Sequence, residues 1–216
     1  MLKLDKQTKL DYKKEYKDLY LPKQKPTLIQ VPAMNFFMID GKGTPDSNEY
    51  HSAIQSLYTF AFTIKMSKMS GNPPLGYFEY VVPPLEGLWS CENEPFTFEH
   101  KDKWTWTSMI RQPEFVTQEV YERFKDEIAK KKPEIDVTKV RFETFEEGLC
   151  VQIMHIGPYN QEQRSIEQIL QYIEENNLQV DFDSGRRHHE IYLSDPRRCK
   201  PENLKTVLRY PVKPIS

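Results

Sequence analysis

The segment best suited to chemistry is 188–193, which reads His-His-Glu-Ile-Tyr-Leu. In a β-strand, successive side chains alternate between the two faces, so His188, Glu190 and Tyr192 would share one face. A carboxylate beside a phenol can attract a cation or act as a general base, and the phenol can stabilise a developing oxyanion. The alternative is a surface strand with solvated polar residues. The residues expected on the opposite face, against a helix, are His189, Ile191 and Leu193.

A second candidate segment combines a carboxylate with tryptophan. Glu86 stands three residues before Trp89 in a predicted Pro-rich bend, Pro83–Trp89. The other two tryptophans, Trp104 and Trp106, alternate onto one face of a predicted strand. Indole faces suit flat ligands, and a cation over such a face gains roughly 0.5–2 kcal/mol. These residues predict either the wall of an aromatic pocket or ordinary core packing.

The histidines do not indicate a metal site. His155, His188 and His189, with Glu190, are the possible metal ligands. However, His188 and His189 would point to opposite faces of their strand, and no helical H-x-x-x-H motif occurs. We therefore expect neither a metal nor another cofactor.

The elements that must position these residues follow from hydrophobic periodicity and turn signals. The predicted strands cover 27–31, 34–40, 77–82, 103–111, 140–144, 149–156, 188–193 and 205–210. The predicted helices cover 47–64, 117–131 and 161–175, with Ser47 or Asn48 and Thr117 as N-caps.

Two stretches repeat the order strand, turn, helix, strand, strand. The repeats span about 27–111 and about 140–212, with Gly41 and Gly157 expected at equivalent turns. The helix at about 117–132 belongs to neither copy and is expected to connect them. The predicted fold is therefore α+β, with two repeats related by a pseudo-twofold axis. A ligand cleft would lie between them, because interfaces between such units favour ligand sites.

Composition limits the classes of function. The chain has 216 residues, which fits a charged arm over 1–25 and a single domain over 26–216. A net charge of −2 gives no global reason to bind nucleic acid. The first 20 residues lack the apolar core of a signal peptide, and no apolar run approaches a membrane span. Three scattered cysteines suit a reducing compartment. We therefore expect a cytoplasmic protein, with its oligomeric state left open.

Taken together, several stretches resemble the gyrase-inhibitor-like (GyrI-like) family, in its free-standing branch. They span nearly the whole chain in the family's order: LDYKKEYK from Leu10, IDGKG from Ile39, AIQSLY from Ala53, PLEGLW from Pro84, HIGPY from His155 and HHEIYLSDPRR from His188. The resemblance implies a cleft between the repeats, lined by aromatics and holding an acidic residue. The residue that corresponds to this acidic residue is Glu190, which stands in an E-x-Y pattern with Tyr192.

The family resemblance also implies activities. Relatives bind flat, often cationic organic molecules. Some are fused to DNA-binding domains, for which the arm before residue 26 is too short to hold a helix-turn-helix. Some free-standing relatives are similar to hydrolases of cyclopropane-bearing, DNA-alkylating natural products. The resemblance thus implies multidrug binding or xenobiotic detoxification.

Two main hypotheses follow. In the first, the protein is a hydrolase of cyclopropanoid compounds, with Glu190 and Tyr192 as the catalytic pair. In the second, the same cleft sequesters drugs without breaking a bond, and a weaker third has the Met1–Lys25 arm docking another macromolecule. The expected ligand-binding residues are Glu86, Trp89, Trp104, Trp106, His155 and His188.

Overall fold

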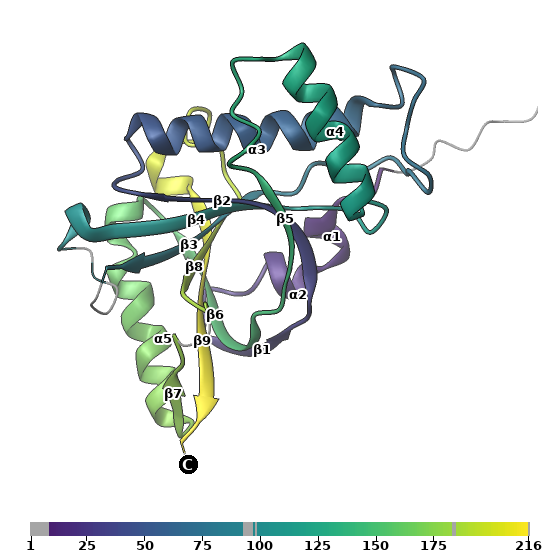
Figure 1. The fold of residues 1–216 in the computed structure, drawn as a ribbon. Coiled ribbons are helices and arrows are strands. Elements are labelled where there is room, and N and C mark those ends of the chain that lie inside the picture. Colours follow the sequence, from purple (N-terminus) through teal and green to yellow (C-terminus); the bar gives the residue numbers. More distant parts are fainter. Residues whose placement is uncertain (1–8, 93–96, 98, 183–184, 216) are drawn as a thin grey trace, which may run out of the picture.

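The computed structural model describes residues 9–92, 97, 99–182 and 185–215. Its organising element is a strongly curled antiparallel sheet that forms a half-barrel (Figure 1). The strands are β1 (Thr27–Val31), β2 (Met34–Lys42), β3 (Leu85–Cys91), β4 (Trp104–Arg111), β5 (Arg141–Phe145), β6 (Gly148–Ile156), β7 (Leu178–Val180), β8 (His188–Tyr192) and β9 (Lys205–Pro214). Their order is β1-β6-β9-β8-β3-β4-β2-β5, and β7 pairs with β9.

Three long helices and two short ones complete the fold. They are α1 (Tyr12–Glu15), α2 (Lys17–Tyr20), α3 (Asn48–Met66), α4 (Gln118–Lys131) and α5 (Gln163–Glu175). The Ser47 side chain accepts a hydrogen bond from the Tyr50 N–H, and Thr117 accepts from Val120, so both predicted caps are confirmed. Helix α3 packs on β2 and β4, α4 packs on α3, and α5 packs on β6, β7 and β9 (Figure 1).

The predicted α+β class and the repeat are confirmed in the strand order. The first repeat contains β2, α3, β3 and β4, and the second contains β6, α5, β8 and β9. The order β2-β4-β3 on one side mirrors β6-β9-β8 on the other, and β3 pairs with β8 where the two halves meet. The pattern of strand order is therefore the same when it is followed from either end of the sheet.

The strand that precedes each repeat pairs with the other repeat. Strand β1 leads into β2 but pairs with β6, and β5 leads into β6 but pairs with β2. Only two residues separate the strands at each of these connections, 32–33 and 146–147. These short connections draw the two ends of the strand order together and curl the sheet.

One predicted strand is wrong. Residues 77–82 form only an isolated bridge, in which Leu10 pairs with Tyr80. The ring of Tyr80 instead packs against Phe115 in an aromatic cluster. The true third strand is β3, in the stretch that we expected to be a Pro-rich bend. Pro83 and Pro84 stand just before it, where their missing N–H groups remove no bond from the ladder.

The turn glycines also correspond differently from the prediction. The N–H of Gly157 donates to the carbonyl of Leu204, and the N–H of Gly43 donates to that of Trp104. Both glycines follow the paired ends of their strands and have positive φ, +144° and +90°. Gly43, rather than Gly41, is therefore the counterpart of Gly157.

The described part of the N-terminal arm packs inside the half-barrel. Helices α1 and α2 lie in the hollow of the sheet (Figure 1), with Tyr12 and Tyr20 buried. The Met154 N–H donates to the carbonyl of Lys23, which extends this attachment to the segment before β1. Residues 1–8 of the predicted arm lie outside the described residues.

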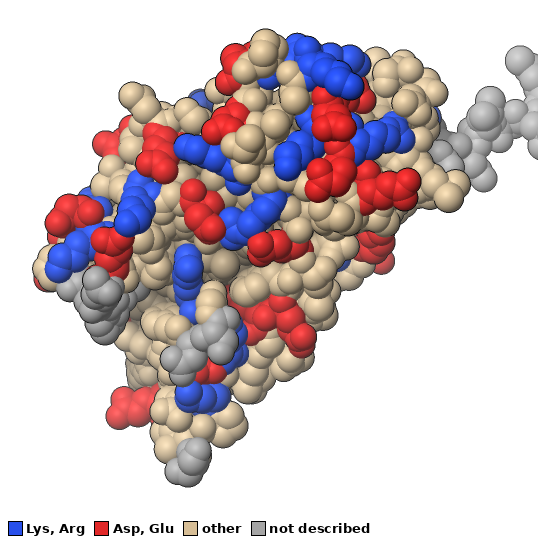
Figure 2. Space-filling view, viewed as in Figure 1, with Lys and Arg blue, Asp and Glu red and all other residues tan. Residues whose placement is uncertain are grey.

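Charge is spread over the surface. On the face seen in Figure 2, basic and acidic side chains are interspersed and do not gather into one basic patch. None of the helices in the described residues combines the length and apolar composition that a membrane crossing needs.

Candidate functional site

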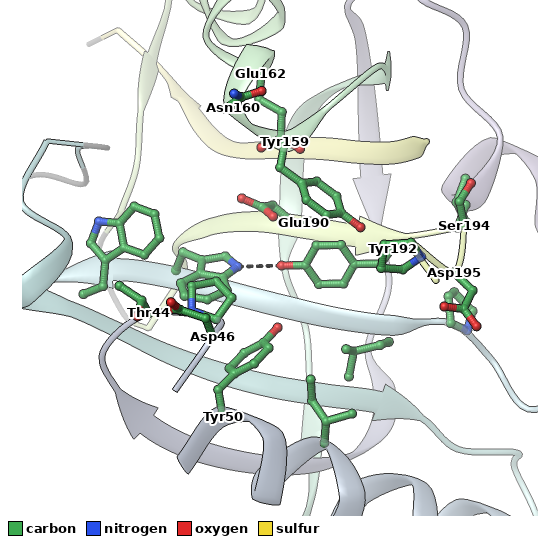
Figure 3. Close-up of a pocket in the computed structure, with 18 of the residues that line it drawn as sticks. Thr44, Asp46, Tyr50, Tyr159, Asn160, Glu162, Glu190, Tyr192, Ser194 and Asp195 are labelled. Atoms are coloured by element: carbon green, nitrogen blue, oxygen red, sulfur yellow. Dashed lines mark hydrogen bonds between the residues drawn. The ribbon is translucent and has the colours of Figure 1, made fainter. Parts of the chain in front are cut away.

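A large pocket opens on the face of the sheet that carries α3 and α5. Its volume is about 2020 Å³, and its walls come from both repeats (Figure 3). The floor is the β3–β8 pair at the centre of the sheet. The side chains that line it include Tyr50, Trp89, Trp104, Tyr159, Glu162, Glu190 and Tyr192.

The register of β3 and β8 sets the floor of the pocket. Gly87 stands opposite Glu190 in this pairing. A Cβ atom at Gly87 would lie 2.8 Å from Nε1 of Trp89 and 3.2 Å from the hydroxyl of Tyr192. The missing side chain therefore lets the indole and the phenol meet above β3.

Glu190 is held by a neighbour on its own strand. Its Oε1 lies 2.9 Å from Nε2 of His188, and both side chains are buried. An ionised carboxylate can only accept, so with Glu190 ionised the His188 nitrogen must donate. Glu190 lines the pocket, whereas His188 is fully buried and does not. His188 is thus placed to position the carboxylate rather than to touch a ligand.

Tyr192 is connected to the aromatic wall. Its hydroxyl accepts a hydrogen bond from Nε1 of Trp89 at 2.9 Å, drawn as the dashed line in Figure 3. Burial, followed by the negative charge of Glu190, raises the pKa of Tyr192 far above its usual range. The phenol therefore keeps its proton at neutral pH and can donate a hydrogen bond into the pocket.

Two further tyrosines complete the aromatic surface. Tyr50, on α3, packs on Trp89 with ring centroids 5.7 Å apart. Tyr159, after β6, meets Tyr192 edge-on at 5.9 Å. Burial, with Glu162 and Glu190 adding negative charge, raises the pKa of Tyr159 to about 12. Burial and the charge of Glu190 also raise the pKa of Tyr50, so both phenols are neutral donors at neutral pH.

Of the three tryptophans, two line the pocket. Trp89 and Trp104 contact each other with ring centroids 5.5 Å apart and belong to its wall. Trp106 is only 1% exposed and lies across Gly41, behind the ring of Tyr50. The expectation that Trp106 lines the cleft is corrected, because its ring is covered by α3.

Residues 24–213 match the model of the GyrI-like small molecule binding domain. The chain belongs to the GyrI-like family. An uncharacterized conserved protein from Listeria innocua is 53% identical, with a TM-score of 0.90 over 95% of this chain and all of that one. A hydrolase from the same organism is 50% identical, with a TM-score of 0.86 over the same shares.

More distant matches share only the fold. The C-terminal domain of EcmrR is 12% identical, with a TM-score of 0.53 over 88% of this chain and 98% of that one. No curated protein matches the sequence significantly. The GyrI-like assignment establishes a small-molecule binding domain.

Glu86 lies on the opposite face of the sheet of this GyrI-like chain. It is 1% exposed, and its Oε2 lies 3.0 Å from Nε2 of His189. The other ring nitrogen of His189 lies 3.0 Å from Oε2 of Glu147, which also accepts from Arg209 at 2.9 Å. The expected ligand-binding role of Glu86 is therefore corrected: its strand position points it away from the pocket, into a buried ionic cluster.

The ionic cluster favours a charged His189. Both nitrogens of its ring lie 3.0 Å from carboxylate oxygens, an arrangement that suits a cationic ring with two donors. Burial alone would lower the pKa of His189, but Glu147 and Glu86 outweigh it and raise it to about 9. Burial would raise the pKa of Glu147, but His189 and Arg209 lower it to about 2.

The two faces of β8 are thus used differently from the prediction. The His189 face is covered by a helix, as expected, but the helix is the short α2 of the arm; the long helices α3 and α5 lie on the Glu190 face. Tyr20 of the arm donates to Oε1 of Glu86 at 3.3 Å, and Arg209 donates to the Leu19 carbonyl at 2.9 Å.

His155 has a local role. Its Nδ1 lies 3.0 Å from the hydroxyl of Ser165, and its Nε2 lies 3.2 Å from the carbonyl of Pro158. It joins the end of β6 to the start of α5 and is not part of the pocket wall. The ligand-binding prediction for His155 is corrected accordingly. Within the described ranges, no three His, Cys, Asp or Glu side chains gather to hold a metal ion.

Sequence reasoning missed three pocket residues. Tyr50 stood in the predicted apolar stripe of a helix, and nothing distinguished it from core residues. Tyr159 ends the HIGPY stretch and Glu162 follows it, but the family resemblance gave no role to either residue. Their positions depend on how α5 folds back over the sheet, which local pattern does not reveal.

Proposed function

We propose that this pocket binds flat aromatic molecules, cationic ones included, and hydrolyses cyclopropane-bearing genotoxic compounds. The observation that carries the proposal is Glu190, buried and held by His188, beside the Tyr192–Trp89 pair on the floor of an aromatic-walled pocket. A relative at 50% identity is a hydrolase. We place this detoxifying activity in the cytoplasm, where the three free cysteines would stay reduced.

Binding would rest on ring contacts and one negative charge. Trp89 and Trp104 offer indole faces, and Tyr50 and Tyr159 bound the same space. Such contacts contribute about 0.5–1.5 kcal/mol each beyond the area they bury. Glu190 gives a cationic ligand its counter-charge in a poorly solvated place.

The chemistry would be the addition of water across a strained carbon–carbon bond. Glu190 takes a proton from water while the water oxygen attacks a cyclopropane carbon. The ring bond breaks, and its electron pair moves into the conjugated carbonyl, whose oxygen becomes negative. Tyr192, kept neutral by its raised pKa, hydrogen-bonds that oxygen. The base contributes about 10²–10⁴-fold to the rate.

The second candidate is binding without turnover. The pocket, at about 2020 Å³, exceeds the roughly 300–1,000 Å³ of drug-sized sites, so it can take ligands in more than one position. Loose placement favours sequestering many compounds over the fixed geometry that catalysis needs.

Glu190→Gln separates the two candidates. The change keeps the size of the side chain but removes its charge and basicity. The protein is incubated with a spirocyclopropane dienone, and the water adduct is followed by mass spectrometry. Affinities for a quaternary ammonium dye and its neutral isostere are measured in parallel. Glu174→Gln, on the exposed side of α5, is the matched control.

For a hydrolase, Glu190→Gln abolishes adduct formation and Glu174→Gln does not. For a binder, no adduct forms with the parent, and Glu190→Gln weakens only the cation. If Glu190→Gln retains full activity and full cation affinity, Glu190 is not the functional carboxylate.

A further inference from the structure

A second carboxyl, that of Glu162, faces the same pocket. The residue stands immediately before α5 and lines the wall above Glu190 and Tyr159 (Figure 3). Its side chain is buried, with the residue 1% exposed. Its Oε1 has no hydrogen-bond partner among the described residues. A buried carboxyl in a ligand pocket, with one oxygen that accepts no hydrogen bond, requires an explanation.

The surroundings of Glu162 favour its neutral form. The groups that act on it are Glu190 from β8, which is acidic, and the Thr206 hydroxyl from β9. The phenols of Tyr159 and Tyr210 also interact electrostatically with Glu162. None of these four described groups is a cation.

Four effects compete at this carboxyl. Burial and then the charge of Glu190 raise the pKa of Glu162 well above its usual range, and Thr206 opposes them. The N-terminus of α5 also favours a carboxylate, but such an end contributes only about 0.3–1 kcal/mol. Full burial beside a like charge outweighs that contribution. Burial and the charge of Glu190 therefore favour the protonated form of Glu162.

The two pocket carboxyls are thus differentiated by their partners. Glu190 has Nε2 of His188 at 2.9 Å from its Oε1. Oε1 of Glu162 has no hydrogen-bond partner within the described residues, and the hydroxyl of Thr206 is the one opposing group at this carboxyl. A pair of carboxyls whose environments separate their protonation states is the usual arrangement of a base and an acid.

We propose that Glu162 is the proton donor of this site, delivering its proton to the ligand oxygen on which negative charge develops. The inference rests on the hydrolysis proposed above. Tyr192 can hydrogen-bond that oxygen but holds its own proton too tightly to give it up. A separate acid is needed for the product to leave as a neutral phenol.

With Glu162 as the donor, the reaction balances. Water gives one proton to Glu190 and its hydroxyl to the cyclopropane carbon. The broken carbon–carbon bond leaves its electron pair on the conjugated oxygen, which takes the proton of Glu162. The product contains one added water. Glu190 is then neutral and Glu162 ionised, and one proton passing from Glu190 to Glu162 restores the site.

The test uses the full chain with Glu162→Gln, Glu162→Asp and the exposed control Glu174→Gln. The probe substrate is a spirocyclopropane dienone, with kcat and KM measured across pH. Infrared spectra at pH 7 follow the carbonyl stretch of a protonated carboxylic acid, which requires no turnover.

We expect Glu162→Gln to lower kcat about 10²–10⁴-fold with KM essentially unchanged. The fall of the parent's kcat at high pH should disappear in this variant, and Glu162→Asp should recover part of the rate. The infrared band should be present in the parent and in Glu174→Gln and missing from Glu162→Gln.

Unchanged kcat in Glu162→Gln, or an infrared band that survives in it, overturns the proposal. A parallel loss of ligand affinity and of the unfolding midpoint also overturns it, because it indicates a structural role. If the parent itself forms no water adduct, the hydrolase proposal fails and proton donation fails with it. The infrared result then shows whether Glu162 is nevertheless neutral, so the two failures are distinguishable.

Discussion

Replacing His189 by glutamine tests the buried ionic cluster behind the pocket. The pKa of His189 rises from an ordinary 6.5 to about 9 in the folded protein. Each unit of pKa corresponds to about 1.4 kcal/mol, so protonation of His189 stabilises the fold by about 3 kcal/mol. The residue is 2% exposed, and solvent screening therefore reduces this figure little.

The sign follows from the direction of the change. A raised pKa gives stability that is fully present below pH 6.5 and is lost as pH rises through about 9. Glu147, with a pKa of about 2, stays ionised throughout that window. The free energy of unfolding of the parent should therefore exceed that of His189→Gln by about 3 kcal/mol near pH 6, with the excess vanishing above pH 9.

Urea unfolding at pH 6, 7, 8, 9 and 9.5, followed by circular dichroism, measures this difference directly. His51→Gln, at an exposed position on α3, controls for the loss of a histidine as such. A difference between parent and His189→Gln that is constant across pH would refute the reasoning. It would mean that the imidazole is neutral between the two carboxylates.

Three further predictions test the pocket and the arm. Gly87→Ala should cost about 1–3 kcal/mol in urea unfolding and change the tryptophan emission, because its Cβ would displace the Trp89 ring; an unchanged midpoint and spectrum would contradict this. Trp104→Phe should weaken binding of a flat dye in fluorescence titration by about 2–10-fold, and Trp106→Phe should not. An equal loss of dye affinity in both variants would show that Trp106 also lines the pocket. Tyr20→Phe should lower the unfolding free energy by about 0.5–1.5 kcal/mol through loss of its bond to Glu86. No measurable loss would show that the contact is unimportant.

Local pattern was sufficient for most of the fold. The apolar stripe of α3 and the caps at Ser47 and Thr117 predicted two helices, because both signals depend on residues close in sequence. The error at 77–82 had a local cause as well. The aromatic residues there resemble a strand, yet their rings pack on Phe115 from a distant segment. Tertiary packing overrode the local preference.

The site was harder to predict from the sequence than the fold was. Alternation placed Glu190 and Tyr192 on one face of β8, as the structure has them, because strand period is a local property. It could not tell which face α3 and α5 would cover. Glu86 was assigned to the pocket because its stretch was read as a bend; in strand β3 it lies on the face opposite to that of Trp89. Glu162 enters the pocket only through the return of α5, a long-range feature.

The exchange of leading strands between the repeats has a consequence for synthesis. Strand β1 ends at residue 31, and its partner β6 begins at residue 148. At about 5–20 residues per second, the ribosome needs on the order of ten seconds to produce that partner. Until then the nascent chain presents unpaired strand edges, which other chains can join. The final strand, β9, inserts between β6 and β8 and brings Arg209 to Glu147. Charge neutralisation of the half-barrel interior therefore waits for nearly the last residues to emerge.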